Sequence, residues 1–262
     1  MKRNPLSRLF SVLAFISLVS LACSTLATDI PPTGTPQPTA TRTLVPTATL
    51  TPTNTPRPTR TPNLAATQRA DEINAEAQSY FEMGYLSTAE GSFVEYDDFK
   101  SEWAQLGWYQ WSILGDRARD FFMSAHLKWS SAYRNADTSG CGFVFAVQEN
   151  GDHYAVFLDR TEILFLDSDS AYNYSRRVGL TRGTGRVRFG NPADQPVEAD
   201  MTLIVIKAYA YVLVDGEVMG EYSLSQSKLL KGNLGLTLLS GTNKDYGTRC
   251  EMTNIHAWIP ND

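Results

Sequence analysis

The 262-residue chain has little of several features that would point to particular protein classes. It has three cysteines and three histidines, no internal repeat, and no glycine-rich loop of the kind that holds the phosphates of a nucleotide. No apolar run is long enough to cross a bilayer. Charged residues make up 19% of the chain and hydrophobic residues 42%, which excludes whole-chain disorder, a coiled coil and a polytopic membrane protein.

Cationic residues are also scarce in the body of the chain. Residues 63–262 hold 17 Lys and Arg against 27 Asp and Glu, a formal charge of −10. An acidic body disfavours nucleic acid or anionic lipid as the main partner, because the release of counterions requires a cationic face.

Residues 1–22 have the form of an export signal. Three cations precede an apolar stretch, Leu9–Leu21, that is too short to span a membrane. The stretch ends in Leu21-Ala22-Cys23, which resembles the lipobox of bacterial lipoproteins, with Ser20 where that motif carries leucine. We therefore expect acylation of Cys23 and a protein lipid-anchored to the bacterial cell membrane, outside the cytoplasm. The alternative is an ordinary secretory signal.

Residues 23–62 form the predicted lipid-anchored stalk. Within it, residues 31–62 hold nine of the thirteen prolines and twelve threonines, with no acid. Such a segment cannot bury enough apolar surface to offset the entropy of ordering, so we expect it to stay unfolded and extended. The layout is then an anchor, a stalk and a folded body.

Residues 63–90 are predicted to hold a helix. The acids on one side of it, Glu76 among them, mark the face expected to meet solvent. Two placements stay open: a neck between stalk and domain, or a helix packed on the domain. The apolar side chains spaced by three and four are Ile73, Ala77, Tyr80 and Phe81.

Residues 91–262 are predicted to form an antiparallel β-sandwich. The clearest strand is Phe121–Trp129, whose odd-numbered side chains share an apolar face. Asp215-Gly216, between alternating hydrophobic residues, is the strongest hairpin signal. Ten or so short strands over such a length indicate an all-β jelly roll. The other expected strands are Gly142–Gln148, His153–Leu158, Glu162–Leu166, Gly185–Phe189, Met201–Ala208, Tyr209–Val214, Glu217–Tyr222, Leu234–Leu239 and Cys250–Ile259.

The body of the chain resembles the concanavalin A-like lectin and glucanase superfamily, in particular its laminin-G-like and 3-keto-disaccharide-hydrolase-like branches. The resemblance spans about residues 120–259 and rests on core and turn positions, so it implies the jelly-roll fold more than a function. It also implies a disulfide between Cys141 and Cys250, which stand where similar bacterial surface domains carry a bonded pair. The segments that carry it are Phe122–Trp129, Gly140–Phe145, Tyr154–Leu158, Leu203–Lys207, Val212–Val218, Gly232–Leu236 and Cys250–Ile255.

The count of cysteines leads to the same pair. If Cys23 carries lipid, Cys141 and Cys250 remain, and an exported chain can oxidise them. The bridge would close a loop of about 110 residues, worth on the order of 4–5 kcal/mol in the chain-entropy model. The alternative is two buried thiols.

The candidate ligand site is a short cationic segment within the acidic body of the chain. Residues 171–193 contain five arginines and no acid. Arginine beside tyrosine suits a carboxylated or sulfated sugar, because the guanidinium binds the anion through two hydrogen bonds and the ring lies against the sugar. The alternative is a half-buried strand whose arginines pair with nearby acids. The predicted ligand-binding residues are Tyr172, Tyr174, Arg176, Arg177 and Arg182.

Acidic residues give weaker signals. Glu162 and Asp167 are the nearest pair of carboxylates for glycoside hydrolysis, but a spacing of five puts them on opposite faces of a strand. Asp167 and Asp169 are candidate calcium ligands that lack the third ligand and the glycine of a helix–loop–helix calcium site. No other cofactor is expected.

The remaining aromatic residues and histidines are ambiguous. A cluster of aromatic residues suits either stacking on neutral sugars or packing, and each histidine is expected on a strand surface. We therefore predict a non-catalytic, lectin-like surface protein that binds a glycan or similar extracellular ligand. The alternatives are a structural or protein-interaction module of the cell envelope and a glycoside hydrolase. The aromatic cluster consists of Trp103, Trp108, Tyr109 and Trp111.

Overall fold

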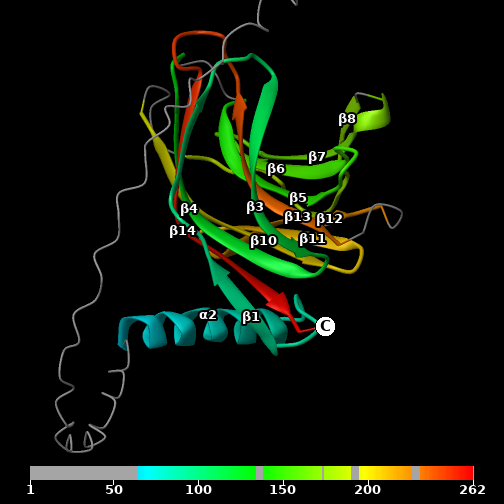
Figure 1. The fold of residues 1–262 in the computed structure, drawn as a ribbon. Coiled ribbons are helices and arrows are strands. Elements are labelled where there is room, and N and C mark those ends of the chain that lie inside the picture. The colour runs from blue at the N-terminus through cyan, green and yellow to red at the C-terminus, as the bar shows by residue number, and fades with distance from the viewer. Residues whose placement is uncertain (1–63, 134–137, 173, 190–194, 226–230, 262) are drawn as a thin grey trace, which may run out of the picture. The chain divides into compact units, whose positions relative to one another are not determined.

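The computed structural model describes residues 64–133, 138–172, 174–189, 195–225 and 231–261 (Figure 1). Two antiparallel sheets pack face to face, and one helix, α2 (Leu64–Glu82), lies on the outside of one of them. This confirms the predicted β-sandwich of jelly-roll type. Within these residues, no helix has the length and apolar character needed to span a membrane.

The larger, eight-stranded sheet has the order β1-β14-β4-β10-β11-β12-β9, and β2 also pairs with β14. Its strands are β1 (Gly91–Glu95), β2 (Phe99–Trp103), β4 (Phe121–Ser131), β9 (Leu180–Gly183), β10 (Val197–Ile206), β11 (Tyr209–Val214), β12 (Glu217–Ser223) and β14 (Thr248–Pro260).

The smaller, six-stranded sheet has the order β3-β13-β5-β6-β7-β8, so β3 and β8 are its edges. A single 3₁₀ turn, Ser170–Tyr172, connects β7 to β8. The strands are β3 (Trp108–Ala118), β5 (Gly140–Val147), β6 (His153–Leu158), β7 (Ile163–Asp169), β8 (Tyr174–Arg177) and β13 (Gly232–Ser240).

Strand β4 confirms the pattern of its sequence. Its odd-numbered side chains from Phe121 to Trp129 all lie in the main core between the sheets. Its even-numbered side chains face outward, where Phe122 packs under the helix and Lys128 meets solvent. An alternating strand therefore serves two separate surfaces.

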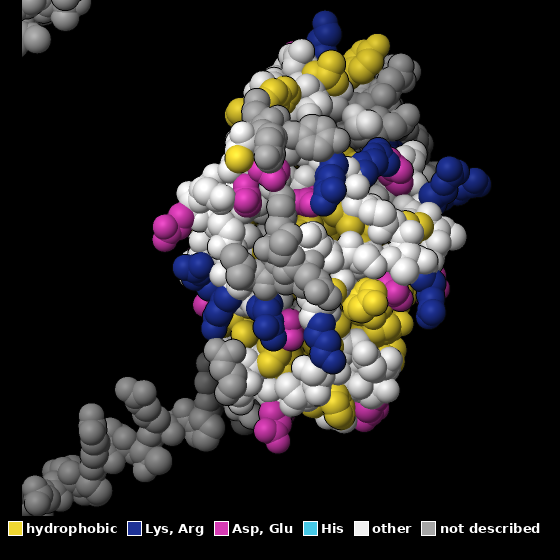
Figure 2. Space-filling view, turned by 90° about the vertical axis from the view of Figure 1, so that its right-hand side faces the viewer, with side chains coloured by type: hydrophobic (Ala, Val, Ile, Leu, Met, Phe, Trp, Pro, Cys, Tyr) yellow, Lys and Arg dark blue, Asp and Glu magenta, His cyan; other side chains and the backbone are white. Residues whose placement is uncertain are grey.

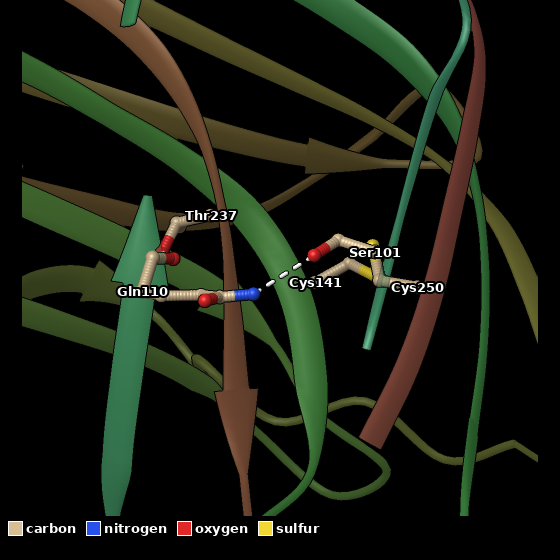
Figure 3. Close-up of a disulfide and its surroundings, with 5 residues drawn as sticks. All are labelled: Ser101, Gln110, Cys141, Thr237 and Cys250. Carbon is tan, nitrogen blue, oxygen red and sulfur yellow. Dashed lines mark hydrogen bonds between the residues drawn. A yellow bond between two sulfur atoms is a disulfide. The ribbon is translucent and has the colours of Figure 1, made fainter. Parts of the chain in front are cut away.

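Two links cross from one sheet to the other (Figure 3). The disulfide between Cys141 of β5 and Cys250 of β14 is formed, and both residues are fully buried. Nearby, the Gln110 side-chain amide on β3 donates a hydrogen bond of 2.8 Å to the Ser101 hydroxyl on β2. The predicted cysteine pair is thus confirmed, and it ties the two layers together through the core.

Turn residues explain why the predicted β11–β12 hairpin is confirmed and why one expected strand is wrong. Asp215 and Gly216 both have positive φ, 49° and 81°, and form the tight β11–β12 hairpin that Asp-Gly predicts. The expected strand Gly185–Phe189 is wrong, because only Arg186 forms an isolated bridge. Gly183 and Gly185 have φ of 94° and 59°, which turn the chain away from an extended path.

The helix packs on the domain, which decides between its two expected placements. Its buried side chains, Ile73, Ala77 and Tyr80, contact an apolar area on the outer face of the eight-stranded sheet. In the ribbon view the helix lies beside β1 (Figure 1). Phe81 does not join them and is 41% exposed. The sheet residues under the helix are Phe122, Ile204, Leu213 and Trp258.

Candidate functional site

The arginines of the predicted ligand site are partly occupied by internal ion pairs. Arg176 on β8 donates from Nε and Nη2 to Asp167 Oδ2 at 3.0 and 2.9 Å, and Asp167 is buried. Arg177 donates to Glu162 Oε1 at 2.6 Å, and this bond raises the pKa of its guanidinium. The acids that pair with them come from β7 and the residue just before it.

The other predicted site residues lie apart from this pair. Arg182 is on β9, in the eight-stranded sheet, opposite Glu221. Tyr172 ends the 3₁₀ turn and Tyr174 begins β8, and their side chains lie outside what the structure describes. On the face that carries β8, Lys and Arg side chains alternate with Asp and Glu rather than form one cationic area (Figure 2).

The carboxylates that the sequence offers as calcium ligands or for glycoside hydrolysis have structural partners. Asp167 holds Arg176, and Asp169 Oδ1 accepts the backbone N–H of Ala171 at 3.1 Å. Across the described ranges, no three His, Cys, Asp or Glu side chains gather where they could hold a metal ion. Glu162 and Asp167 therefore stabilise the β7–β8 region through Arg177 and Arg176.

A different feature stands out on β3, the edge strand of the six-stranded sheet. Trp108 is 56% exposed and Trp111 is 41% exposed, and Ile113 beside them is also open to solvent. Large apolar side chains that gather at the surface mark interaction sites more often than scattered ones do. The described part of the chain pairs β3 with β13 alone, which leaves its other edge unpaired.

Tyr109, Trp111 and His153 form a connected group that we name the aromatic platform. The Tyr109 hydroxyl lies 2.8 Å from His153 Nε2, and His153 Nδ1 lies 2.7 Å from the Gly151 carbonyl oxygen. A carbonyl can only accept, so Nδ1 donates to Gly151, while the Tyr109 hydroxyl can donate to Nε2 or accept from it. These two contacts orient the imidazole. The Trp111 ring rests 4.5 Å from the imidazole, centroid to centroid.

The platform covers a small apolar cluster on the outer face of its sheet. Tyr109 and Trp111 reach from β3 to His153 on β6, across β13 and β5. Three strand spacings are about 14 Å, so the rings lie across the sheet rather than stand upright on it. The buried residues of the cluster are Val144, Val147, Ala155, Phe157 and Leu239.

The outer face of the six-stranded sheet carries apolar and aromatic side chains at the platform. Alternation from the inward residues Phe143, Phe165 and Asp167 places Tyr109, Trp111 and Ile113 outward on β3. Glu162 stands just before β7, two positions ahead of the outward residue Leu164, and is paired with Arg177.

A second cluster lies at the margin of α2, on the eight-stranded sheet. Glu76 Oε2 is 2.9 Å from His256 Nε2, while Oε1 accepts from the Tyr80 hydroxyl at 2.8 Å and from the Ser124 hydroxyl at 3.2 Å. Burial alone would raise the pKa of the Glu76 carboxyl, but His256 and the two hydroxyls outweigh burial and lower it. Glu76 was expected to face solvent, and the structure corrects this, because the sheet beneath the helix offers it two partners, His256 and Ser124, and Tyr80 of the helix adds a third.

The histidines also differ from expectation. His153 and His256 are buried, and His126 is the one of the three that lies at the surface, 2.8 Å from Asp200 Oδ1. A cavity of about 320 Å³ lies between His126 and the helix. The polar side chains of Glu76, Ser124 and His256 satisfy one another there, so this cluster serves to hold the helix on the sheet.

The aromatic platform was only partly visible in the sequence. Tyr109 and Trp111 were among the clustered aromatic residues, and their spacing of two is the signal that would place both on one face of a strand. His153 was missed as their partner, because nothing in the sequence connects β3 to β6, which are not neighbours in the sheet.

No protein-family model and no curated protein matches this chain. Solved structures resemble it at the level of fold. One is A. japonicus CB05, with 16% identity, a TM-score of 0.43, and coverage of 66% of this chain and 27% of that one. Another is the carbohydrate-binding module CBM66 from Bacillus subtilis, with 8% identity, a TM-score of 0.42, and coverage of 62% and 92%. Sheep galectin-11 has 10% identity, a TM-score of 0.34, and coverage of 58% and 98%.

These structures are sandwiches of the concanavalin A-like type that the sequence resembles. The chain spans about a quarter of the length of A. japonicus CB05. Likenesses this weak carry no argument about a ligand. A functional conclusion must come from the residues of this chain.

Proposed function

We propose that this protein is a lipid-anchored bacterial surface protein whose sandwich binds a saccharide on the aromatic platform without cleaving it. The observation that carries the proposal is Trp111. Its indole is exposed, yet contact with His153 and Tyr109 fixes its position. A ring that is already ordered loses little conformational entropy when it binds a ligand.

The chemistry of the platform suits the flat, weakly polar face of a sugar ring. Trp111 and Tyr109 provide aromatic surface, and their contacts with His153 hold it in place. Glycoside hydrolysis requires two facing carboxylates, and Glu162 at the margin of this face is already paired with Arg177.

The location rests on the sequence before the domain. The export signal of residues 1–22, Cys23 in its lipobox-like setting and the Pro/Thr-rich residues 31–62 support an anchored, projecting domain. The disulfide fits this location, because such bonds persist in oxidising compartments.

The test is a glycan-array screen of the purified, oxidised chain, followed by titration of the best neutral oligosaccharide. Trp111→Ala is expected to weaken binding at least tenfold, since stacking on an aromatic ring is lost. Tyr209→Ala is the matched control, because Tyr209 is an equally exposed aromatic residue on the other sheet. Equal affinity of the Trp111→Ala and parent proteins, or no binding across the screen, would overturn the proposal.

A protein-interaction role is the second candidate, favoured by the unpaired edge of β3. Seven residues from Trp108 to Leu114 contain no charge and no proline, the usual protections of an edge strand. A partner could add a strand there. Ile113→Lys would then abolish capture of an envelope protein, while saccharide binding on Trp111 would persist.

A further inference from the structure

The far end of β3 differs in charge from the rest of the body. Strand β3 has a bulge after Ile113. Beyond this bulge, the outward side chain is that of Arg117, which lies opposite Asn233. Its Nη2 donates to the Lys231 carbonyl at 3.1 Å. The other guanidinium N–H groups of Arg117 have no partner among the described residues, so they can still bind an anion.

Arg119 follows Arg117 two positions along the chain, between β3 and β4. Its side chain is 60% exposed, and its ion pair with Asp120 is long, 3.5 Å. Asp120 also accepts the backbone N–H of Lys207, so its charge is shared. Asp116 is held by the Tyr96 hydroxyl at 2.9 Å. Among the described residues, Arg117 therefore has no carboxylate partner and Arg119 has only the shared Asp120.

A cavity of about 370 Å³ opens at this end, between the β3–β4 turn and the end of β14. This volume falls within the range of small-ligand sites. Its polar lining residues include Ser87, Thr88, Arg119 and Asp120, and Arg117 lies outside the lining. Hydroxyls and cations are the groups that bind a carboxylate or sulfate.

The distance between the two features constrains the ligand. Trp111 and Arg117 lie opposite Thr237 and Asn233, which are four residues apart on β13, so at about 3.3 Å per residue they are roughly 13 Å apart along the sheet. A monosaccharide cannot touch both. A linear chain of several sugar units can lie along β3 with a ring on the platform and an acidic group at the cationic end.

We propose that the ligand is an anionic polysaccharide chain, bound by its sugar ring at the aromatic platform and by its carboxylate or sulfate at Arg117 and Arg119. This inference rests on the proposed function and adds the class of ligand and a second point of contact. The sequence had placed the anion-binding arginines at residues 171–193, where Arg176 and Arg177 are instead paired with acids.

The test compares two probes that differ only in charge: hexagalacturonate and its fully methyl-esterified form. The purified chain is expected to bind the charged form at least tenfold more tightly at low salt, with a difference that falls as salt rises. The double variant Arg117→Gln/Arg119→Gln is expected to bind both probes equally. A heparin hexasaccharide in a parallel titration separates sulfate from carboxylate as the preferred anion.

The matched control is Arg182→Gln/Arg186→Gln, which removes two exposed cations elsewhere and is expected to keep the preference. Equal affinity of the parent protein for both probes, or a preference lost in the control rather than in Arg117→Gln/Arg119→Gln, overturns the inference and leaves the proposed function standing. Loss of both probes in Trp111→Ala supports the platform independently of charge.

A direct measurement separates the two proposals further. Titration with monomeric galacturonate is expected to shift the Nε–Hε NMR signals of Arg117 and Arg119 and not those of Arg182 and Arg186. Shifts that are absent or equal at all four arginines contradict the cationic site, whatever the array screen finds.

Discussion

The two sheets carry aromatic side chains on their outer faces, and they differ in what covers them. On the eight-stranded sheet, Phe122 and Trp258 are stacked at 5.9 Å and fully buried, because α2 lies over them. On the six-stranded sheet, Trp108 and Trp111 remain exposed, and no described helix covers them. The same kind of side chain is core on one face and available surface on the other.

The histidines sharpen the comparison. His256 contacts the Glu76 carboxylate on the helix, whereas His153 lies within hydrogen-bonding distance of the Tyr109 hydroxyl in its own sheet. The difference teaches that the polar groups of one outer face help to hold a further element on the sheet, while those of the other hold an aromatic ring at the surface.

The largest expected effect is on the covered face. Trp258→Ala removes a fully buried indole beneath α2 and is expected to lower the free energy of unfolding by about 3–5 kcal/mol. Urea denaturation at pH 7 measures this. A loss below about 1 kcal/mol would show that the helix does not bury this face in solution.

A smaller effect is expected at the helix clamp. Glu76→Gln removes a charged hydrogen-bond acceptor and is expected to cost about 1.5–3 kcal/mol at pH 7. The folded-state pKa of Glu76 lies below the ordinary value for a glutamate, about 4.5, so its stabilisation is present above about pH 4.5. It is lost as pH falls through the lower, folded-state pKa.

Denaturation of the parent protein and Glu76→Gln from pH 7 to pH 2.5 tests this. The two stability curves should converge at the acid end. Glu82→Gln is the control, because Glu82 lies on the exposed side of the same helix. Parallel curves for the parent protein and Glu76→Gln would contradict the assigned role of the carboxyl.

The smallest effect on stability is expected on the open face. Trp111→Ala is expected to change the free energy of unfolding by no more than about 1 kcal/mol, because the indole is already 41% exposed. The same denaturation series measures it against Trp258→Ala. A loss of 3 kcal/mol or more would make Trp111 part of the core and remove the contrast between the faces.

The sequence predicts those elements whose pattern is local. The alternation from Phe121 to Trp129 identifies β4 and both of its faces, and Asp215-Gly216 identifies its hairpin by turn chemistry. Spacing by three and four predicts the helix but not its position. That position depends on apolar residues of four different strands, which only the folded sheet brings together.

The candidate site was less accessible to prediction. Strand β3 was missed because Gln110 and Ser112 face inward while Tyr109 and Trp111 face outward, the reverse of an ordinary alternation. The bonds of Arg176 and Arg177 depend on the register of β7 against β8, which composition cannot supply. The predictions for Cys23 and the stalk lie outside the described residues and stay predictions.

The disulfide has a mechanical consequence for the sandwich. It joins Cys141 and Cys250, which are 109 positions apart, so the chain between them cannot lengthen under tension while the bond is intact. At about 3.4 Å per residue, this withholds roughly 370 Å of contour length. A force applied across these two positions would meet a short connection, and reduction of the one bond would convert it to a long and compliant one.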